Sequence, residues 1–205
     1  MKNLPEKTVE RLSKYRRTLL IALANGKDHI FSHELAYMIH ITPVQVRRDL
    51  MLISHSGTLR KGYDVKELID LISSILDSEQ GIKIAVVGIG NLGRAIIGYI
   101  SGQRTKLKIV AAFDTNPEKV DRIFAGIACY PYNRLNEIIK KESIEIGIIT
   151  VPADSASEVS EKLILAGVKG IMNFSPRSIN VSSNIYLEEL DLITSLEKVA
   201  YYVKH

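Results

Sequence analysis

The chain has 205 residues, an apolar share of 46% and a net charge of +4. This length makes one large domain or two small ones with ordinary hydrophobic cores, so disorder, collagen and coiled coils are excluded. The charge is uneven: residues 1–63 carry 11 basic and 5 acidic side chains, or +6, and residues 64–205 carry 16 and 18, or −2. This asymmetry predicts that the front segment meets a polyanion.

A single cysteine, Cys129, excludes a disulfide framework. Without a cluster of Cys or His residues there is no basis for a thiolate zinc site, and we expect no metal. No apolar run reaches the length of a membrane span, and the first residues do not resemble a signal peptide. We therefore expect a cytoplasmic protein with no membrane partner.

Three helices are predicted in the front segment. Apolar residues between positions 5 and 24 recur at helical spacing, which predicts a first helix. Ser32 is expected to cap a short second helix. Residues 42–45, Thr-Pro-Val-Gln, have the pattern of a capping box and predict a third helix that runs to about Ile53. A longer helix followed by two short ones across a tight turn indicates a helix-turn-helix.

A wing is predicted directly after these helices. Residues 56–63 have glycines near both ends and two adjacent cations, and they are too few for a helix, so a β-hairpin is the economical interpretation. Helical spacing resumes at 65–76, and residues 78–81 form the expected domain boundary. The front of the chain is therefore predicted to be a winged helix-turn-helix domain of residues 1–79.

From Ile82 onward, apolar runs alternate with helical patterns. The predicted strands cover residues 82–87, 107–113, 127–130, 144–151 and 169–174, and the predicted helices cover 92–101, 117–122, 134–142 and 154–166. Strands separated by helices of this length need parallel pairing with right-handed crossovers, which predicts a doubly wound α/β sheet over residues 80–190. An extended stretch at 185–187 and a helix at about 191–203 complete the chain.

A glycine motif follows the first of these strands. Gly88, Gly90 and Gly93 form a G-x-G-x-x-G that opens a helix, and Asp114 ends the next strand 21 residues after Gly93. The three glycines would permit a tight turn, close approach to a pyrophosphate and close packing of helix on sheet. Asp114 would accept hydrogen bonds from ribose hydroxyls and repel a 2′-phosphate. The motif predicts a Rossmann domain that binds NADH and NAD⁺ rather than the phosphorylated cofactors.

The turn at Thr150-Val151-Pro152 lies at the carboxyl end of another predicted strand. Ligands sit at that edge of such sheets, so these residues are expected to line the crevice, although a plain strand-to-helix loop explains them nearly as well. A dehydrogenase needs a general acid or base, yet no histidine occurs between Ser56 and Lys204. We therefore expect no enzyme. A small NAD(H)-dependent oxidoreductase with an appended interaction domain is the alternative from another class.

The third helix carries the predicted DNA-reading surface. Its exposed side is expected to present Gln45, Arg47 and Arg48, and its inward side Val44, Val46 and Leu50. Arginine suits guanine, glutamine suits adenine, and Thr42 with the helix N-terminus suits a phosphate. Arg60 and Lys61 at the wing tip would enter a minor groove or grip the backbone. A solvated arginine pair is the alternative, and Asp49 is expected to fix an arginine or to pair within the domain.

Taken together, these motifs resemble the Rex family of bacterial redox-sensing transcriptional repressors. The matching stretches are Arg11-Leu12 to Tyr15, residues 45–50, Gly62-Tyr63, residues 87–93, Phe113-Asp114, residues 150–153 and residues 166–174. The resemblance implies a homodimer whose C-terminal helix, residues 191–205, is swapped onto the partner subunit. It also implies that the winged helix binds double-stranded operator DNA when NADH is scarce and that NADH releases the DNA.

The resemblance assigns three further residues. It places Tyr99 in the nicotinamide region, and it pairs Asp191 of the swapped helix with Arg17 of the first helix. Within the glycine motif, Asn91 and Leu92 are also expected to contact the dinucleotide. From the residues alone, Tyr99 is a helix-packing aromatic and Asp191 a charge favoured by the helix dipole.

The chain departs from the family pattern where specificity should lie. It has Met51-Leu52-Ile53-Ser54 where the family shows Ser-Tyr-Phe-Gly, residues 58–63 displace the wing arginine by one position, and Leu192 stands where Phe is common. A paralogue with an altered operator or weakened redox sensing is therefore a second alternative.

Overall fold

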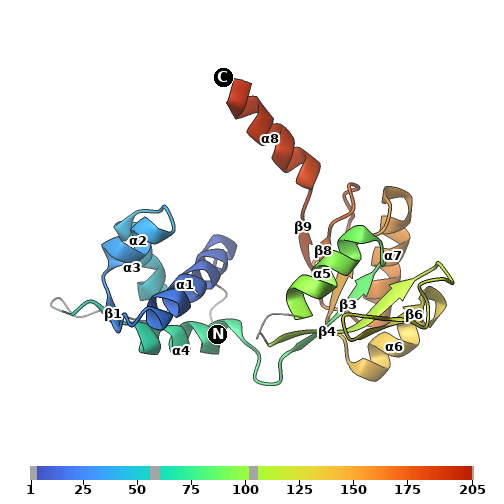
Figure 1. The fold of residues 1–205 in the computed structure, drawn as a ribbon, viewed down its shortest axis with the longest axis horizontal. Helices are drawn as coiled ribbons and strands as arrows, with labels where there is room; N and C mark the ends of the chain where they lie inside the picture. The colour runs from blue at the N-terminus through green and yellow to red at the C-terminus, as the bar shows by residue number, and fades with distance from the viewer. Residues whose placement is uncertain (1–3, 56–60, 102–105, 205) are drawn as a thin grey trace. The chain divides into compact units, whose positions relative to one another are not determined.

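The computed structural model describes residues 4–55, 61–101 and 106–204, and the chain divides into two compact units, residues 1–79 and 80–205 (Figure 1). The first unit is mainly helical and the second is built on a large β-sheet. Each unit has its own hydrophobic core. Each is described by itself below.

The N-terminal unit confirms the predicted helices and adds a short strand. Its elements are α1 (Glu6–Ala24), β1 (His29–Ile30), α2 (Ser32–Met38), α3 (Pro43–Leu52), β2 (Tyr63–Asp64) and α4 (Val65–Leu76). Strands β1 and β2 pair antiparallel, so the chain just before α4 is tied to the segment between α1 and α2. The predicted hairpin falls largely on residues 56–60, outside the described residues.

The helices of this unit meet through one apolar stripe each. The buried residues include Leu12, Tyr15 and Leu19 of α1, Val46 and Leu50 of α3, and Leu68 and Ile72 of α4. The inward orientation predicted for Val44 is wrong, because its side chain is 47% exposed. Val44 precedes Val46 by two residues, and two residues turn an α-helix by more than half a revolution, so the two side chains cannot share a face.

The helix caps differ in detail from the prediction. Thr42 caps α3 as expected, since its hydroxyl accepts a hydrogen bond of 3.2 Å from the Gln45 N–H. The Gln45 side chain does not return to Thr42, so the box is incomplete. The cap assigned to Ser32 is wrong: α2 begins at Ser32 itself, and the carboxylate of Glu34 accepts the Phe31 N–H at 2.8 Å.

The C-terminal unit is a doubly wound sheet with the strand order β5-β6-β4-β3-β7-β8-β9. Its strands are β3 (Ile82–Val87), β4 (Leu107–Asp114), β5 (Ile123–Phe124), β6 (Ile127–Pro131), β7 (Ile146–Ile149), β8 (Gly170–Asn173) and β9 (Tyr186–Glu189). All neighbours pair parallel except β5 with β6. The chain leaves the central strand β3 toward β4 on one side and reaches β7 on the other, so the topological switch point lies between β3 and β7.

The helices of this unit are α5 (Asn91–Ser101), α6 (Leu135–Glu142), preceded by the short 3₁₀ helix η1 (Tyr132–Arg134), α7 (Ala153–Ala166) and α8 (Leu192–Lys204). Cores lie on both faces of the sheet, one with α6 and α7 and one with α5. None of the helices in the described ranges combines the length and apolarity needed to cross a bilayer.

The helix predicted at 117–122 is wrong. The N–H groups of Lys119 and Val120 both bond to the Asn116 carbonyl, which makes a single turn. Asp121 then adopts a positive φ of 57° and reverses the chain into the β5–β6 hairpin. Six residues give too few hydrogen bonds to sustain a helix without packing, and a left-handed residue stops propagation.

The terminal helix α8 has no buried residue within the single chain. One stripe of its surface is nevertheless apolar, with Leu192, Ile193, Leu196, Val199 and Val203 each at least 58% exposed. A helix with this pattern normally faces a core.

Candidate nucleotide site and candidate DNA-contact surface

The glycine loop joins β3 to α5 at the switch point. Gly88 has a φ of 97°, and a Cβ there would lie 2.8 Å from the Thr150 carbonyl oxygen. A Cβ at Gly93 would collide with the Gly88 carbonyl oxygen, whereas a Cβ at Gly90 would meet no atom within 4 Å. Two glycines therefore permit close backbone packing, and the backbone at Gly90 stays open toward the space where a ligand would approach.

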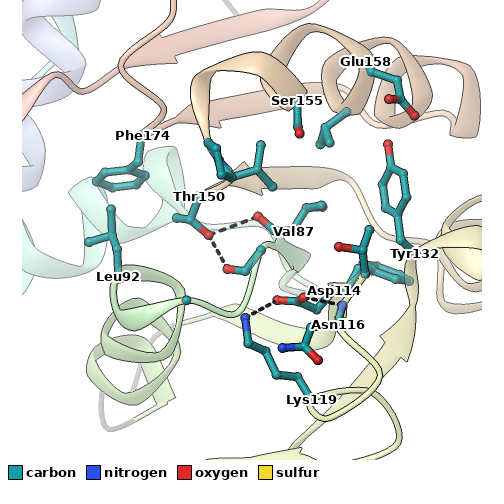
Figure 2. Close-up of a pocket in the computed structure, with 17 residues that line it drawn as sticks. Val87, Leu92, Asp114, Asn116, Lys119, Tyr132, Thr150, Ser155, Glu158 and Phe174 are labelled. Carbon is teal, nitrogen blue, oxygen red and sulfur yellow. Dashed lines mark hydrogen bonds and ion pairs between the residues drawn. The ribbon is translucent and has the colours of Figure 1, made fainter.

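Thr150 holds this loop from the neighbouring strand. Its hydroxyl lies 3.0 Å from the Val87 carbonyl oxygen and 2.7 Å from the Gly88 carbonyl oxygen, as donor to both (Figure 2). A hydroxyl has one proton, so the two carbonyls share it. Thr150 thus fixes the start of the loop.

Asp114 ties the second strand to the same loop. Its carboxylate accepts hydrogen bonds from the Ile89 N–H at 2.7 Å and the Asn116 N–H at 2.8 Å, and it pairs with the Lys119 ammonium at 3.1 Å. Burial raises the pKa of this carboxyl, but the hydrogen bonds from Asn116, Ile89 and Lys119 outweigh burial and leave the pKa below its ordinary value. Asp114 is therefore ionised at neutral pH, as an acceptor for ribose hydroxyls must be.

These residues open onto one cavity of about 590 Å³. Seven of the ten residues predicted to bind the cofactor line it: Gly88, Gly90, Leu92, Asp114, Thr150, Val151 and Pro152. Leu92 and Phe174 stand at one end, Tyr132 and Glu158 at the other, and Asp114 with Lys119 along one side (Figure 2). The volume and the elongated arrangement suit an extended, partly apolar ligand of nucleotide size.

Three predicted cofactor residues do not line this cavity. Gly93 lies beneath the loop, and Asn91 is exposed at the first position of α5. Tyr99 lies on the same helix with 69% of its surface exposed. Its contact with a nicotinamide stays a prediction.

Sequence reasoning missed several side chains that other elements contribute to the cavity. The cavity is also lined by Asn116, Lys119, Tyr132, Ser155, Glu158 and Phe174. Phe174 and Tyr132 directly follow the strands β8 and β6, so the rule that ligands sit at the carboxyl ends of strands would have found them. Ser155 and Glu158 lie within α7 and carry no comparable signal.

The exposed face of α3 carries the candidate DNA contacts. Arg47 and Arg48 are exposed, and among the described residues Arg47 donates to the Ser32 hydroxyl at 3.1 Å while Arg48 has no partner. Thr42 and Lys61 are exposed as well, and Arg60 lies outside the described residues. A helix N-terminus with a capping hydroxyl and two adjacent arginines fits the chemistry of phosphate and base-edge contact.

Asp49, on the buried side of α3, connects this helix to α1 through hydrogen bonds. Its side chain is fully buried and accepts two hydrogen bonds from the Arg11 guanidinium, at 2.6 and 2.8 Å, and one from the Tyr15 hydroxyl at 2.7 Å. Gln45 donates to the same carboxylate at 3.0 Å. The pairing within the domain expected for Asp49 is therefore present, and Gln45 is partly committed to it.

The two residues of the implied switch lie in different units. Arg17 is exposed on α1. Asp191 precedes α8 and accepts hydrogen bonds from the Ile193 N–H at 2.9 Å and the Thr194 hydroxyl at 2.6 Å, an N-terminal cap. The hydrogen bond from the Thr194 hydroxyl, and to a smaller extent the one from its backbone N–H, lower the pKa of the Asp191 carboxyl. Pairing of Arg17 with Asp191 stays a prediction.

Comparison with family models finds two matches along the chain. Residues 3–50 match a model described as a putative DNA-binding protein N-terminus, and residues 79–177 match a CoA binding domain model. The two matches fall on the two compact units.

Relatives match over nearly the whole chain. A redox-sensing transcriptional repressor Rex of Ligilactobacillus salivarius is 36% identical over 98% of this chain and 95% of its own length, and one of Listeria monocytogenes is 35% identical over 98% and 94%. Among solved structures, RSP, a Rex-family repressor, in complex with β-NAD⁺ and operator DNA is 30% identical over 99% of this chain and 94% of its own, with a TM-score of 0.92. The same protein with β-NADH gives a TM-score of 0.87.

Proposed function

Because the chain belongs to the Rex family of redox-sensing transcriptional repressors, we propose that it binds NADH and NAD⁺ in the cavity of its C-terminal unit and operator DNA through its N-terminal unit. NADH then releases the DNA. The observation that carries this proposal is the glycine loop with Asp114, which opens onto a nucleotide-sized cavity in a chain whose other unit is a helix-turn-helix.

The proposal divides the chain by task. Residues 1–79 act as the winged-helix DNA-binding domain, 80–190 as the dinucleotide-binding domain, and 191–205 as a helix that crosses to a second subunit. The exposed apolar stripe of α8 supports a homodimer, since such a stripe needs a covering surface. Operator DNA also favours a dimer, because symmetric half-sites match a twofold protein. We also propose a cytoplasmic location, because a repressor has to reach its operator DNA.

The redox response requires the site to distinguish the two nicotinamide rings. The oxidised ring is charged, and transferring a charge to apolar surroundings costs free energy. Leu92 and Phe174 form an apolar end of the cavity, at the loop that begins α5 and the end of β8. A nicotinamide placed there favours the reduced, neutral ring.

The oxidoreductase alternative is not favoured, because the relatives that match over the full length are repressors by name. The test is operator affinity at fixed salt, measured by fluorescence anisotropy with no nucleotide, with NAD⁺ and with NADH. We expect NADH alone to release the DNA. Equal DNA affinity with both nucleotides would contradict redox sensing, and absence of DNA binding in every condition would contradict the repressor.

A further inference from the structure

The hydroxyl of Tyr132 is buried and has no hydrogen-bond partner among the described residues. Leaving a buried polar group without a hydrogen bond is costly. In native proteins, a buried group that has no protein partner usually bonds to water or to a ligand. Tyr132 begins the turn after β6 and lines the cavity at the end away from Leu92 and Phe174 (Figure 2). The unpaired donor therefore belongs to the same cavity as the glycine loop.

The helix α7 contributes a carboxylate to the same end of the cavity. Glu158, on α7, lines the same end of the cavity, and the Tyr132 hydroxyl points toward it in Figure 2. Lys162, one turn further along α7, pairs with Glu158 at 2.9 Å and places its ammonium 4.3 Å from the centre of the Tyr132 ring. Burial raises the pKa of Tyr132, so the hydroxyl keeps its proton and acts as a donor. This end of the cavity thus holds one buried donor, the Tyr132 hydroxyl, and one carboxylate that is also paired with Lys162.

The position of this pair identifies the part of a dinucleotide that would meet it. In a dinucleotide bound as proposed, the pyrophosphate would meet the glycine loop and a ribose would meet Asp114. One base would then lie beyond Asp114, and the nicotinamide would lie toward Leu92 and Phe174. The base beyond Asp114 would then be the adenine. Its edges carry an exocyclic amine, which donates, and ring nitrogens, which accept.

On the basis of the proposed function, we propose that Tyr132 and Glu158 read this adenine: the Tyr132 hydroxyl donates to a ring nitrogen and the Glu158 carboxylate accepts from the exocyclic amine. Hypoxanthine has a carbonyl oxygen where adenine has the amine, so the carboxylate would face another acceptor. The pair therefore selects an adenine dinucleotide over its deaminated analogue. Because the Glu158 side chain is 63% exposed, the selection is modest.

The test compares NADH with reduced nicotinamide hypoxanthine dinucleotide by calorimetric titration of the full chain. We expect the wild type to bind NADH about 3- to 10-fold more tightly, the range of one net hydrogen bond. Glu158→Gln should abolish this preference, because an amide can donate to the carbonyl of hypoxanthine. Glu161→Gln, an exposed position on the same helix that does not line the cavity, is the control and should keep the preference.

Tyr132→Phe should weaken NADH binding by a similar factor, while Tyr130→Phe, which lies outside the cavity lining, should not. Equal affinity of the wild type for the two dinucleotides, or an unchanged preference in Glu158→Gln, would overturn the base-reading assignment while leaving the proposed function intact. Failure of the wild type to bind NADH at all would overturn both. If Tyr132→Phe does not fold, the wild-type and Glu158→Gln comparison still decides.

Discussion

At the scale of single residues, Asp114 is bonded to the glycine loop and to a cation at once. Three donors already use its carboxylate, which has about four acceptor positions. Lys119 lines the cavity beside it. A 2′-phosphate on the ribose would thus meet the Asp114 carboxylate and the Lys119 ammonium together. The ion pair between them leaves the ammonium less available to the phosphate.

We predict that Asp114→Ala weakens NADH binding about tenfold, the effect of losing one hydrogen bond to a charged group. The same change frees Lys119 for a 2′-phosphate, so NADPH affinity should rise. Titration of both nucleotides checks this, with Asp114→Ala/Lys119→Ala as the control, which should keep the NADH loss and remove the NADPH gain. Equal NADPH affinity in the two variants would show that Lys119 does not reach the phosphate.

Asp49 gives the second prediction at this scale. Asp49→Asn leaves the Arg11 guanidinium beside a neutral amide, and we expect it to lower the free energy of unfolding by about 2–3 kcal/mol at pH 7. Asp70→Asn, at an exposed site on α4, should change it by less than about 0.5 kcal/mol. Urea titrations followed by circular dichroism provide the measurement.

The stability loss in Asp49→Asn should depend on pH. Burial raises the pKa of Asp49, but hydrogen bonds from Arg11, Tyr15 and Gln45 bring it below its ordinary value. A carboxyl with a lowered folded-state pKa stabilises the fold above its unfolded-state value of about 3.9 and loses that contribution as the pH falls through the folded-state pKa. The stability gap between wild type and Asp49→Asn should therefore narrow below about pH 4. A gap that is constant with pH would assign the loss to packing.

Some residues of the site can be predicted from the sequence, and others cannot. The glycines and Asp114 act through backbone geometry at fixed spacing within one β-α-β unit, so a local pattern is sufficient. Glu158 lies within the helix α7, and only the sheet order brings it to the cavity that Tyr132 lines from the end of β6. No local spacing encodes that approach. Gln45 shows a different error. The helical pattern predicts an exposed side chain, but its amide donates a hydrogen bond to the buried carboxylate of Asp49.

At the scale of elements, the packing of α5 on the sheet depends on one glycine. Gly93→Ala places a methyl group against the Gly88 carbonyl oxygen, so α5 must shift and the loop must open. We predict that this variant is destabilised by about 1–3 kcal/mol, the usual cost of overpacking, and loses NADH binding. Thermal unfolding and NADH titration measure the two effects.

Gly98 supplies a matched control on the same helix. A Cβ there meets no atom within 4 Å, and alanine is favoured over glycine in helices, so Gly98→Ala should stabilise the unit by about 0.5–1 kcal/mol and keep NADH binding. Loss of NADH binding in both variants would mean that α5 does not tolerate an added methyl group at either position. That result would contradict a specific role for Gly93.

The elements themselves followed from periodicity wherever they were long. Helices α1, α3, α4 and α7 and strands β3 and β4 have enough residues to show a repeat of 3.6 or a continuous apolar run. Strand β1 has two residues and no period, so it was missed. The predicted helix at 117–122 failed because its apparent pattern belongs to one turn followed by a hairpin.

At the scale of the whole molecule, a repressor must convert nucleotide binding in one unit into DNA release by the other. A ligand shifts such an equilibrium only by its differential affinity for two arrangements, and moving from 1:99 to 99:1 takes about 5.5 kcal/mol. The part of this free-energy difference that separates NADH from NAD⁺ must come from contacts with the nicotinamide, because the two nucleotides share every other group. If the nicotinamide occupies the Leu92 and Phe174 end of the cavity, as proposed, we expect the arrangement that changes to involve the surface next to that end.

Substitutions in the apolar stripe of α8 test whether a second subunit takes part in that change. Leu196 and Val199 lie near the centre of the stripe, and burying both would contribute about 3–6 kcal/mol to association. We predict that Leu196→Asp/Val199→Asp yields a monomer in analytical ultracentrifugation and weakens operator binding, because one winged helix would then hold one half-site. Lys198→Asp, on the opposite side of α8, should leave the dimer intact. If the double variant stays dimeric and binds DNA normally, α8 is not the dimer contact, and the redox signal must pass between the units of a single chain.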